Sequence, residues 1–255
     1  MNTWLYDSTF RGFITVIHIL MTENWPEVII SKDDMTQPGL FSDGQTIVTA
    51  DQEKYDLMLK TIETRISREA VNIIKSAFLS ESRGIEQMLY TFIRMGLETG
   101  PAIIHMIEDD HIHRVLKESR RTFFEANKYK GIIRFTDKGD GIKYACMEPD
   151  TNVLPLVAAH FRARFPGERW ILHDTKRHLI LLHEAGNLEL IEETSENVSS
   201  AAAPGNPGTI TANDPYADLW KKYFGTMGIE GRKNSKLQRQ FLPLKRRKYV
   251  LELDN

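Results

Sequence analysis

Five side chains in the second half of the sequence have types suited to acid–base or metal chemistry. They are three carboxylates and two imidazoles: Glu148, Asp150, His160, His173 and Asp174. Such groups can hold a divalent metal ion for phosphodiester chemistry, or share the roles of general acid and base. No known ligand spacing connects them, because they fall on an expected hairpin, a helix and a strand. Asp150 also suits the N-cap of the helix that follows it, so a structural role stays open.

Basic and aromatic side chains alternate in the same region. Five basic residues within sixteen positions are interleaved with three aromatic ones: Arg162, Arg164, Arg169, Lys176 and Arg177, with Phe161, Phe165 and Trp170. A guanidinium offers forked donors to phosphate, and an aromatic ring can stack on an exposed base. We predict one positive surface with Trp170 near its edge, formed by Arg134, Arg164, Lys176 and Arg177. The alternative is that the aromatic rings are core and the arginines form ion pairs.

The charge of the chain is unevenly distributed. Residues 1–113 hold 9 Lys and Arg against 17 Asp and Glu, whereas residues 114–255 hold 24 against 18. Residues 220–250 alone carry ten basic side chains and one acid. This asymmetry indicates a nucleic acid or an acidic partner, although a solvated basic terminus gives the same count. The predicted phosphate contacts in this tail are Lys233, Lys236, Arg239, Lys245, Arg246, Arg247 and Lys248.

Two further groups could suggest a metal or redox site. His111 and His113 follow two aspartates, but on a helix residues two apart face different directions and cannot ligate together. Cys146 falls on an alternating strand, on the same face as Ile142 and Tyr144, which is typical of a buried structural thiol. We therefore predict no metal and no cofactor. The sequence also lacks a phosphate-binding glycine loop and a dinucleotide fingerprint.

Composition narrows the class of protein. The chain has 255 residues, 41% hydrophobic and 27% charged, which is a globular balance. Its single cysteine excludes a disulfide framework and an iron–sulfur cluster held by this chain alone. No stretch approaches the roughly 20 apolar residues of a membrane span, and the apolar segment 13–21 is expected to be a core helix rather than a signal peptide. We expect a cytoplasmic protein without membrane contact.

The spacing of apolar residues predicts an α+β fold in which a helical N-terminal half precedes a small antiparallel sheet. Residues 1–127 form the mostly helical region, with short strands at 3–6, 28–31 and 46–49. Residues 128–192 form a β-β-α-β-β-β unit, with strands at 132–135, 142–147, 170–174, 178–184 and 188–191 and a helix at 153–165. Residues 193–214 are expected to be a flexible linker, and residues 215–255 an amphipathic basic helix and tail.

Several segments of the chain resemble a bacterial family of DNA metabolism and repair proteins. They read KGIIRF at 130–135, EPDTNVLPL at 148–156, WILHDTKR at 170–177 and LQRQ at 237–240. Tyr6-Asp7 and Gly84-Ile85-Glu86 extend the likeness into the first half. Members of this family occur beside a radical-SAM protein of DNA repair, and a related domain of unknown function is fused to uracil-DNA glycosylase-like proteins. The resemblance therefore implies a process, DNA repair, rather than a mechanism.

The resemblance also implies a partner. A radical-SAM cluster needs three cysteines and this chain has one, so the partner would supply that chemistry. One departure is visible at residues 243–249, which read PLKRRKY where similar proteins have a segment like Pro-Lys-Arg-Tyr-Trp. Exchange of aromatic residues for arginine favours phosphate contact over base stacking there.

These observations favour a DNA-binding accessory protein that acts with a radical-SAM repair enzyme. Two alternatives stay open. One is a metal-dependent nuclease, glycosylase or lyase that uses the five candidates around Asp150 and His173. The other is an adaptor whose basic tail contacts an acidic protein instead of DNA. The residues alone leave open whether the protein is an enzyme.

Overall fold

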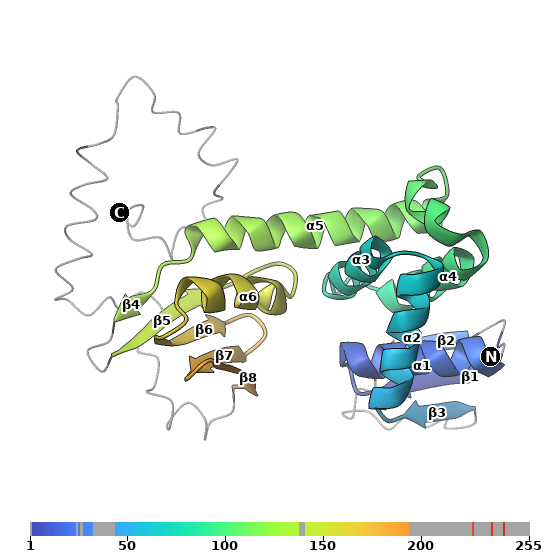
Figure 1. The fold of residues 1–255 in the computed structure, drawn as a ribbon, viewed down its shortest axis with the longest axis horizontal. Coiled ribbons are helices and arrows are strands. Elements are labelled where there is room, and N and C mark those ends of the chain that lie inside the picture. Colours follow the sequence, from blue (N-terminus) through green and yellow to red (C-terminus); the bar gives the residue numbers. More distant parts are fainter. Residues whose placement is uncertain are drawn as a thin grey trace. The chain divides into compact units, whose positions relative to one another are not determined.

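The computed structural model describes residues 2–23, 25, 28–32, 44–137 and 141–193, together with the single positions 226, 236 and 242. The chain divides into two compact units, Met1–Phe124 and Glu125–Asn255. Figure 1 shows the elements of each unit. The predicted α+β class is confirmed, with helices dominating the first unit and a small sheet forming the second.

The first unit is built on a three-stranded sheet. Its strands are β1 (Asn2–Tyr6), β2 (Val28–Lys32) and β3 (Gln45–Val48), in the order β2-β1-β3. Both pairs are parallel, with Trp4 opposite Ile30 on one side and Thr46 on the other. Helix α1 (Phe10–Glu23) connects β1 to β2, and such a crossover makes neighbouring strands parallel. The three strands predicted from the sequence are confirmed.

Four further helices and a short 3₁₀ turn complete the helical part. They are α2 (Gln52–Arg65), α3 (Arg68–Phe78), α4 (Ile85–Thr99), η1 (Gly100–His105) and α5 (Asp110–Ile132). Asp51 and Ser67 cap α2 and α3, because each side chain accepts a hydrogen bond from a backbone N–H three residues ahead. Large apolar side chains such as Phe13, Leu89 and Phe92 are fully buried between the sheet and these helices.

Helix α5 contributes to the cores of both units. Ile112 and Val115 belong to the core of the first unit, whereas Ala126 and Tyr129 belong to that of the second. Their spacings of three and eleven residues, close to one and three helical turns, place them on one side of the helix. The helix continues through Ile132, so the strand predicted at 132–135 is wrong. Pairing begins only at Thr136.

The second unit contains a five-stranded sheet in chain order. Its strands are β4 (Thr136–Asp137), β5 (Ile142–Met147), β6 (Arg169–Asp174), β7 (Leu179–Glu184) and β8 (Asn187–Glu192). Helix α6 (Leu154–Arg164) lies between β5 and β6, as the predicted order required. The sheet is mixed rather than wholly antiparallel, because β5 and β6 pair in parallel. A helix between two strands returns the chain to its starting edge, whereas a tight turn reverses it.

Other sequence predictions are settled or fall outside the described residues. Asp150 does not cap α6, because the N-cap position belongs to Val153. In the described ranges, no helix is both long and apolar enough to cross a bilayer. The predicted linker at 193–214, apart from Glu193, lies outside the described residues. So does the predicted C-terminal basic helix, except for the single positions 226, 236 and 242.

Candidate functional site

The buried carboxylate of Asp174 organises the loop between β6 and β7. One of its oxygens, Oδ1, accepts hydrogen bonds from the backbone N–H groups of Lys176 and Arg177 at 3.1 and 3.3 Å. The other, Oδ2, accepts from Nη1 of Arg177 at 3.1 Å. Burial raises the pKa of Asp174, and the positive charge of Arg177 opposes that rise. Both oxygens are thus held by fixed donors.

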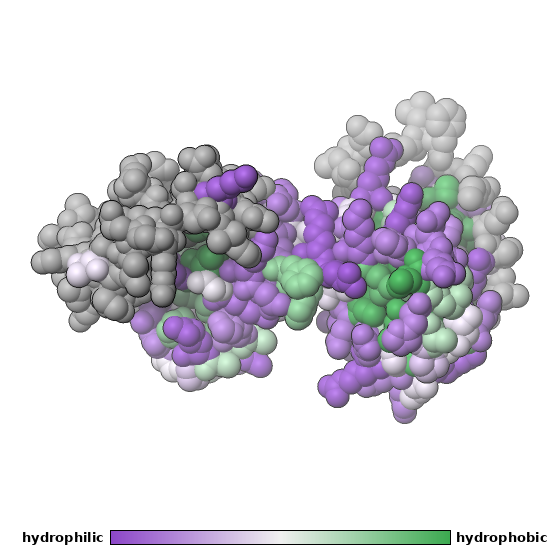
Figure 2. Space-filling model, turned by 90° about the horizontal axis from the view of Figure 1, so that it is seen from above, coloured by the Kyte–Doolittle hydropathy of each residue, from purple (hydrophilic) through white to green (hydrophobic). Residues whose placement is uncertain are grey.

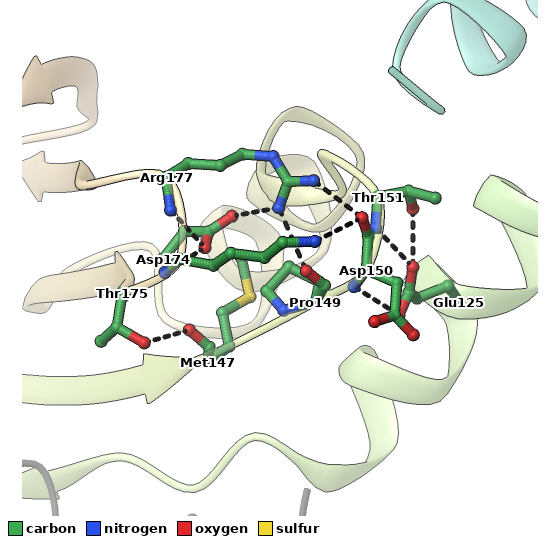
Figure 3. A network of polar contacts seen from close by, with 9 residues as sticks. Glu125, Met147, Pro149, Asp150, Thr151, Asp174, Thr175 and Arg177 are labelled. Carbon is green, nitrogen blue, oxygen red and sulfur yellow. Dashed lines mark hydrogen bonds and ion pairs between the residues drawn. The ribbon is translucent and has the colours of Figure 1, made fainter. Parts of the chain in front are cut away.

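The same arginine joins this loop to the segment after β5. Nη1 and Nη2 of Arg177 donate to the backbone carbonyls of Pro149 and Asp150 at 3.2 and 2.9 Å (Figure 3). Lys176 donates from Nζ to the carbonyl of Asp150 at 2.9 Å. Only 10% of the Arg177 side chain is exposed. The guanidinium therefore holds two loops together instead of facing solvent.

A second buried carboxylate secures the other side of that segment. Glu125, on α5, accepts from the backbone N–H of Asp150 at 3.0 Å through Oε1. Its Oε2 accepts from the N–H and the hydroxyl of Thr151 at 2.8 and 2.7 Å, as Figure 3 shows. We call the whole set the loop network; its members are Glu125, Pro149, Asp150, Thr151, Asp174, Lys176 and Arg177. It fixes the β5–α6 connection, which is a structural task.

A different chain of hydrogen bonds starts from the next residue of β6. His173 precedes Asp174, so its side chain points to the opposite face of the sheet. Its Nδ1 lies 2.8 Å from the hydroxyl of Tyr144 on β5, and its Nε2 lies 3.3 Å from Oε2 of Glu193. We call this group the Tyr144 chain. It comprises Cys146, Tyr144, His173, Glu193 and His178.

The two ends of the Tyr144 chain are defined by a thiol and a second imidazole. The Cys146 thiol donates to the Tyr144 oxygen at 3.1 Å, and Nδ1 of His178 lies 2.7 Å from Glu193 Oε2. The contact with His178 is the main cause that lowers the pKa of Glu193, and His173 lowers it further. A neutral His173 with its proton on Nε2 satisfies both of its contacts, since Nδ1 then accepts from Tyr144. Carboxylate, imidazole and hydroxyl are aligned in the order used for proton transfer.

The five predicted catalytic candidates do not form one cluster. Asp174 and Asp150 belong to the loop network, whereas His173 lies on the other face of the sheet. His160, on α6, packs against the ring of Phe161 at 5.0 Å. Glu148 is half-buried in the segment after β5. Among the residues that the structure describes, no three His, Cys, Asp or Glu side chains are placed to hold a metal ion.

The predicted positive surface is only partly assembled. Trp170 is fully buried and stacks on His183 at 4.9 Å, so its prediction as an exposed edge is wrong. Arg177 forms an ion pair with Asp174, which is the structural alternative to a DNA contact. Arg134 donates to the carbonyls of Gly131 and Ile133 at the end of α5. Arg164 and Lys176 are exposed.

The other predicted sites have simple placements. Asp109 accepts hydrogen bonds from the N–H groups of His111 and Ile112, so it acts as a cap at the start of α5. His111 and His113 are exposed on that helix. Of the predicted contacts in the tail, Lys236 is described and exposed. The others lie outside the described residues: Lys233, Arg239, Lys245, Arg246, Arg247 and Lys248.

Sequence reasoning missed Tyr144 and Glu193. Strand register, which no local pattern records, brings Tyr144 to His173: the parallel pairing of β5 with β6 places Cys146 opposite His173 and Tyr144 opposite Ile171. It also missed a surface pocket of about 500 Å³ in the first unit, lined by Asp7, Thr9, Arg11, Gln52 and Tyr55 among others. This pocket lies beyond the carboxyl ends of β1 and β3.

Comparison with protein families places the chain. A family model described as a domain of unknown function, DUF4130, matches residues 83–252. The chain belongs to this family. The matched residues include α4, α5, α6 and the whole five-stranded sheet, and thus both the loop network and the Tyr144 chain. None of the curated proteins that were searched matches the chain.

Proposed function

We propose that this DUF4130 protein is a DNA-binding accessory protein of DNA repair or metabolism, which acts with a radical-SAM partner enzyme. The proposal of a radical-SAM partner rests on the family resemblance of the sequence. The DNA-binding role rests on the charge of the second half of the chain and on the exposed arginines of α6. On this proposal the protein binds or presents DNA, and the partner supplies the radical chemistry.

Two exposed arginines on α6 carry the proposal. Arg162 and Arg164 are exposed, and in the part of the chain that the structure describes neither forms an ion pair with a carboxylate. The guanidinium of Arg164 lies 5.6 Å from the ring centre of Phe165, and Nζ of Lys143 lies 5.4 Å from the same ring. Arginines without carboxylate partners are available to phosphate, and a cation beside an aromatic ring suits a nucleic-acid backbone and base.

The ion-paired Arg169 offers a matched control on the same unit. It is half-exposed, as an arginine of a DNA surface would be, but it pairs with Glu184 at 2.9 Å. Binding of fluorescein-labelled DNA should be measured by anisotropy over a range of salt concentrations. Each lost phosphate contact flattens the plot of log K against log[salt] by about one unit.

We expect Arg162→Ala/Arg164→Ala to lower the affinity and to flatten the salt dependence by about two units. Arg169→Ala should change the slope little. The tail variant Arg246→Ala/Arg247→Ala/Lys248→Ala should flatten it by about three units. An unaltered slope in both multiple variants, or no DNA binding at low salt, would refute the DNA-binding role. Binding of the partner without any DNA affinity would instead support an adaptor.

A second candidate function, an enzyme that acts on damaged DNA as a nuclease, glycosylase or lyase, is favoured by the Tyr144 chain. Glu193 can orient His173, and Nδ1 of His173 can accept the proton of the Tyr144 hydroxyl. Turnover of a damaged oligonucleotide by the purified protein without its partner, lost in Tyr144→Phe, would favour this candidate. Arg169→Ala should leave that turnover unchanged.

A further inference from the structure

Helix α5 carries an exposed surface of basic and aromatic side chains. We call it the α5 surface and define it by Arg114, Lys117, Arg120, Phe123 and Phe124. All five are exposed. Steps of three and four residues place the basic side chains and Phe124 on one side of the helix, opposite Ile112, Val115 and Thr122, which are buried.

We propose that the α5 surface binds single-stranded DNA, with its basic side chains on the phosphates and its phenylalanine rings on unpaired bases. This inference rests on the proposed DNA-binding function and adds the form of DNA and the place where it binds. The residues belong to the first unit, Met1–Phe124, and are distinct from the arginines of α6.

The basic side chains of the α5 surface are available to a ligand. Among the described residues, Arg114, Lys117 and Arg120 make no ion pair within 4.0 Å. Their neighbour Arg121 shows the contrast, because it pairs with Glu118 at 3.3 Å, and Glu118 also accepts from the hydroxyl of Ser82. Between Arg114 and Arg121 the helix thus holds one neutralised arginine and three basic side chains without a carboxylate partner among the described residues.

The aromatic side chains are the second observation. Phe123 and Phe124 are 52% and 56% exposed, and their ring centres lie 6.4 Å apart in an edge-on arrangement. Two adjacent exposed phenylalanines on a polar helix leave apolar surface in contact with water, which points to a ligand. On the face that Figure 2 draws, hydrophobic side chains lie among hydrophilic ones.

The combination of basic side chains with two exposed aromatic rings favours unpaired bases over a duplex. Phe123 and Phe124 follow Arg120 by three and four residues, so both rings neighbour a guanidinium. Single-strand-binding surfaces combine such cations with aromatic rings on which successive bases stack. In a duplex the bases already stack on each other, so the rings would have no base face to contact. An acidic protein would match the cations but would not require two flat rings.

The test compares two double variants with a matched control. Phe123→Ala/Phe124→Ala removes the rings, and Lys117→Ala/Arg120→Ala removes two charges. Leu57→Ala/Lys60→Ala is the control, because it removes an exposed apolar side chain and an exposed lysine from α2. Anisotropy is measured with fluorescein-labelled oligothymidylate of about twenty nucleotides, with the same length of duplex DNA, and with the corresponding RNA.

We expect the phenylalanine variant to bind the single strand about ten-fold more weakly for each stacked base, and duplex DNA as the wild type does. The charge variant should flatten the salt dependence for the single strand by about 1.4 units. The control should bind like the wild type. Circular dichroism should show all three folded, since the altered side chains are exposed.

The outcomes separate this inference from the proposed function. If the wild type binds no DNA, both fail. If the α6 arginine variant loses DNA affinity while both α5 variants bind like the wild type, the proposed function stands and the α5 surface is overturned. Equal losses on duplex DNA, tighter binding of RNA than of DNA, or a wild-type dimer that the phenylalanine variant abolishes in sedimentation would each overturn single-stranded DNA as the occupant.

Discussion

The two hydrogen-bonded groups that start from neighbouring residues of β6 differ in what holds their polar atoms. In the loop network, Asp174 and Glu125 accept from backbone amides, a guanidinium and a hydroxyl that have no freedom to leave. In the Tyr144 chain, a thiol is bonded to a hydroxyl, the hydroxyl to an imidazole, and this imidazole and a second one to the same carboxylate. One group contains donors that keep their protons at neutral pH, and the other is built of groups that can exchange them.

The hydrogen-bond partners of a side chain therefore distinguish a structural role from a possible chemical one better than its residue type does. Aspartate beside arginine looks like a reactive or ligand-binding pair in a sequence, but here both are buried and bonded to backbone. Histidine beside tyrosine looks like ordinary core, but here both ring nitrogens have side-chain partners. Removal of a buried charged member of the loop network should therefore destabilise the second unit, whereas removal of a member of the Tyr144 chain should mainly change protonation.

The largest effect is expected from Arg177→Ala. It leaves Asp174 as a buried carboxylate without its cation, and it leaves the carbonyls of Pro149 and Asp150 without this donor. Breaking a buried ion pair by removing one partner costs about 3–5 kcal/mol. Urea unfolding should show a loss of this size, and Lys176→Ala, which removes an exposed donor to Asp150, should lose less than about 1 kcal/mol.

The loss of stability in the Arg177→Ala variant should depend on pH. Burial already raises the pKa of Asp174 above its usual value of 3.8, and loss of the guanidinium raises it further. A carboxyl with a raised folded pKa destabilises the fold as the pH rises through the interval between its unfolded and folded values. The stability deficit should hence shrink as the pH falls towards the pKa of Asp174. A deficit that grows on acidification would contradict the buried ion pair.

Glu125→Gln is expected to have the next largest effect. The amide places an NH₂ donor where a carboxylate oxygen accepts, so it faces either the N–H of Asp150 or the two donors of Thr151. A buried donor left without an acceptor costs about 1–3 kcal/mol. Glu184→Gln, in the half-exposed pair with Arg169, should cost less than about 1 kcal/mol. Equal losses in the two variants would mean that Glu125 is not a structural anchor.

Local patterns predicted the elements of this fold but not their partners. The alternation of 142–147 and the apolar stripe of α6 follow from side chains that repeat along one element. The parallel pairing of β5 with β6 depends on the path of α6 in space, which no local pattern records. The sequence likewise does not predict where α5 ends, because Ile132 and Ile133 suit a strand as well as a helix. In the structure the helix ends at Ile132, and Tyr129 and Ile133 are both buried.

The site was predicted less well for the same reason. Their residue types predict Trp170 and Arg177 as DNA contacts, but burial gives both side chains structural roles. Composition predicts Glu193 as part of a linker, but it lies one residue after β8 and accepts hydrogen bonds from His173 on β6 and from His178, one residue before β7. Long-range pairs of this kind are visible only when strand register is known.

Tyr144→Phe should change the stability of the fold little but should clearly change the tautomer of His173. The variant removes the hydroxyl that donates to Nδ1 and accepts from Cys146. Loss of this side-chain hydrogen bond costs about 1 kcal/mol, well below the loss in Arg177→Ala. Without the donor at Nδ1, the tautomers of His173 should redistribute, which nitrogen-15 chemical shifts of the ring report. Unchanged ring shifts would show that Tyr144 does not set the tautomer.

The smallest effect is expected from His178→Ala, and it concerns one carboxyl group. The hydrogen bond from His178 is the largest of the causes that hold the pKa of Glu193 below its usual value of 4.5. A carboxyl with a lowered folded pKa stabilises the fold above its unfolded value, and that contribution is lost as the pH falls through the folded pKa. Removal of His178 should move the pKa of Glu193 up towards 4.5, as followed by carbon-13 NMR of the carboxyl. Because Glu193 is partly exposed, solvent screens the interaction and the unfolding curve should hardly change at neutral pH.

Lys176→Ala should leave the titration of Glu193 as it is. If His178→Ala also left it unchanged, His173 alone would hold the carboxylate, and the Tyr144 chain would end at Glu193.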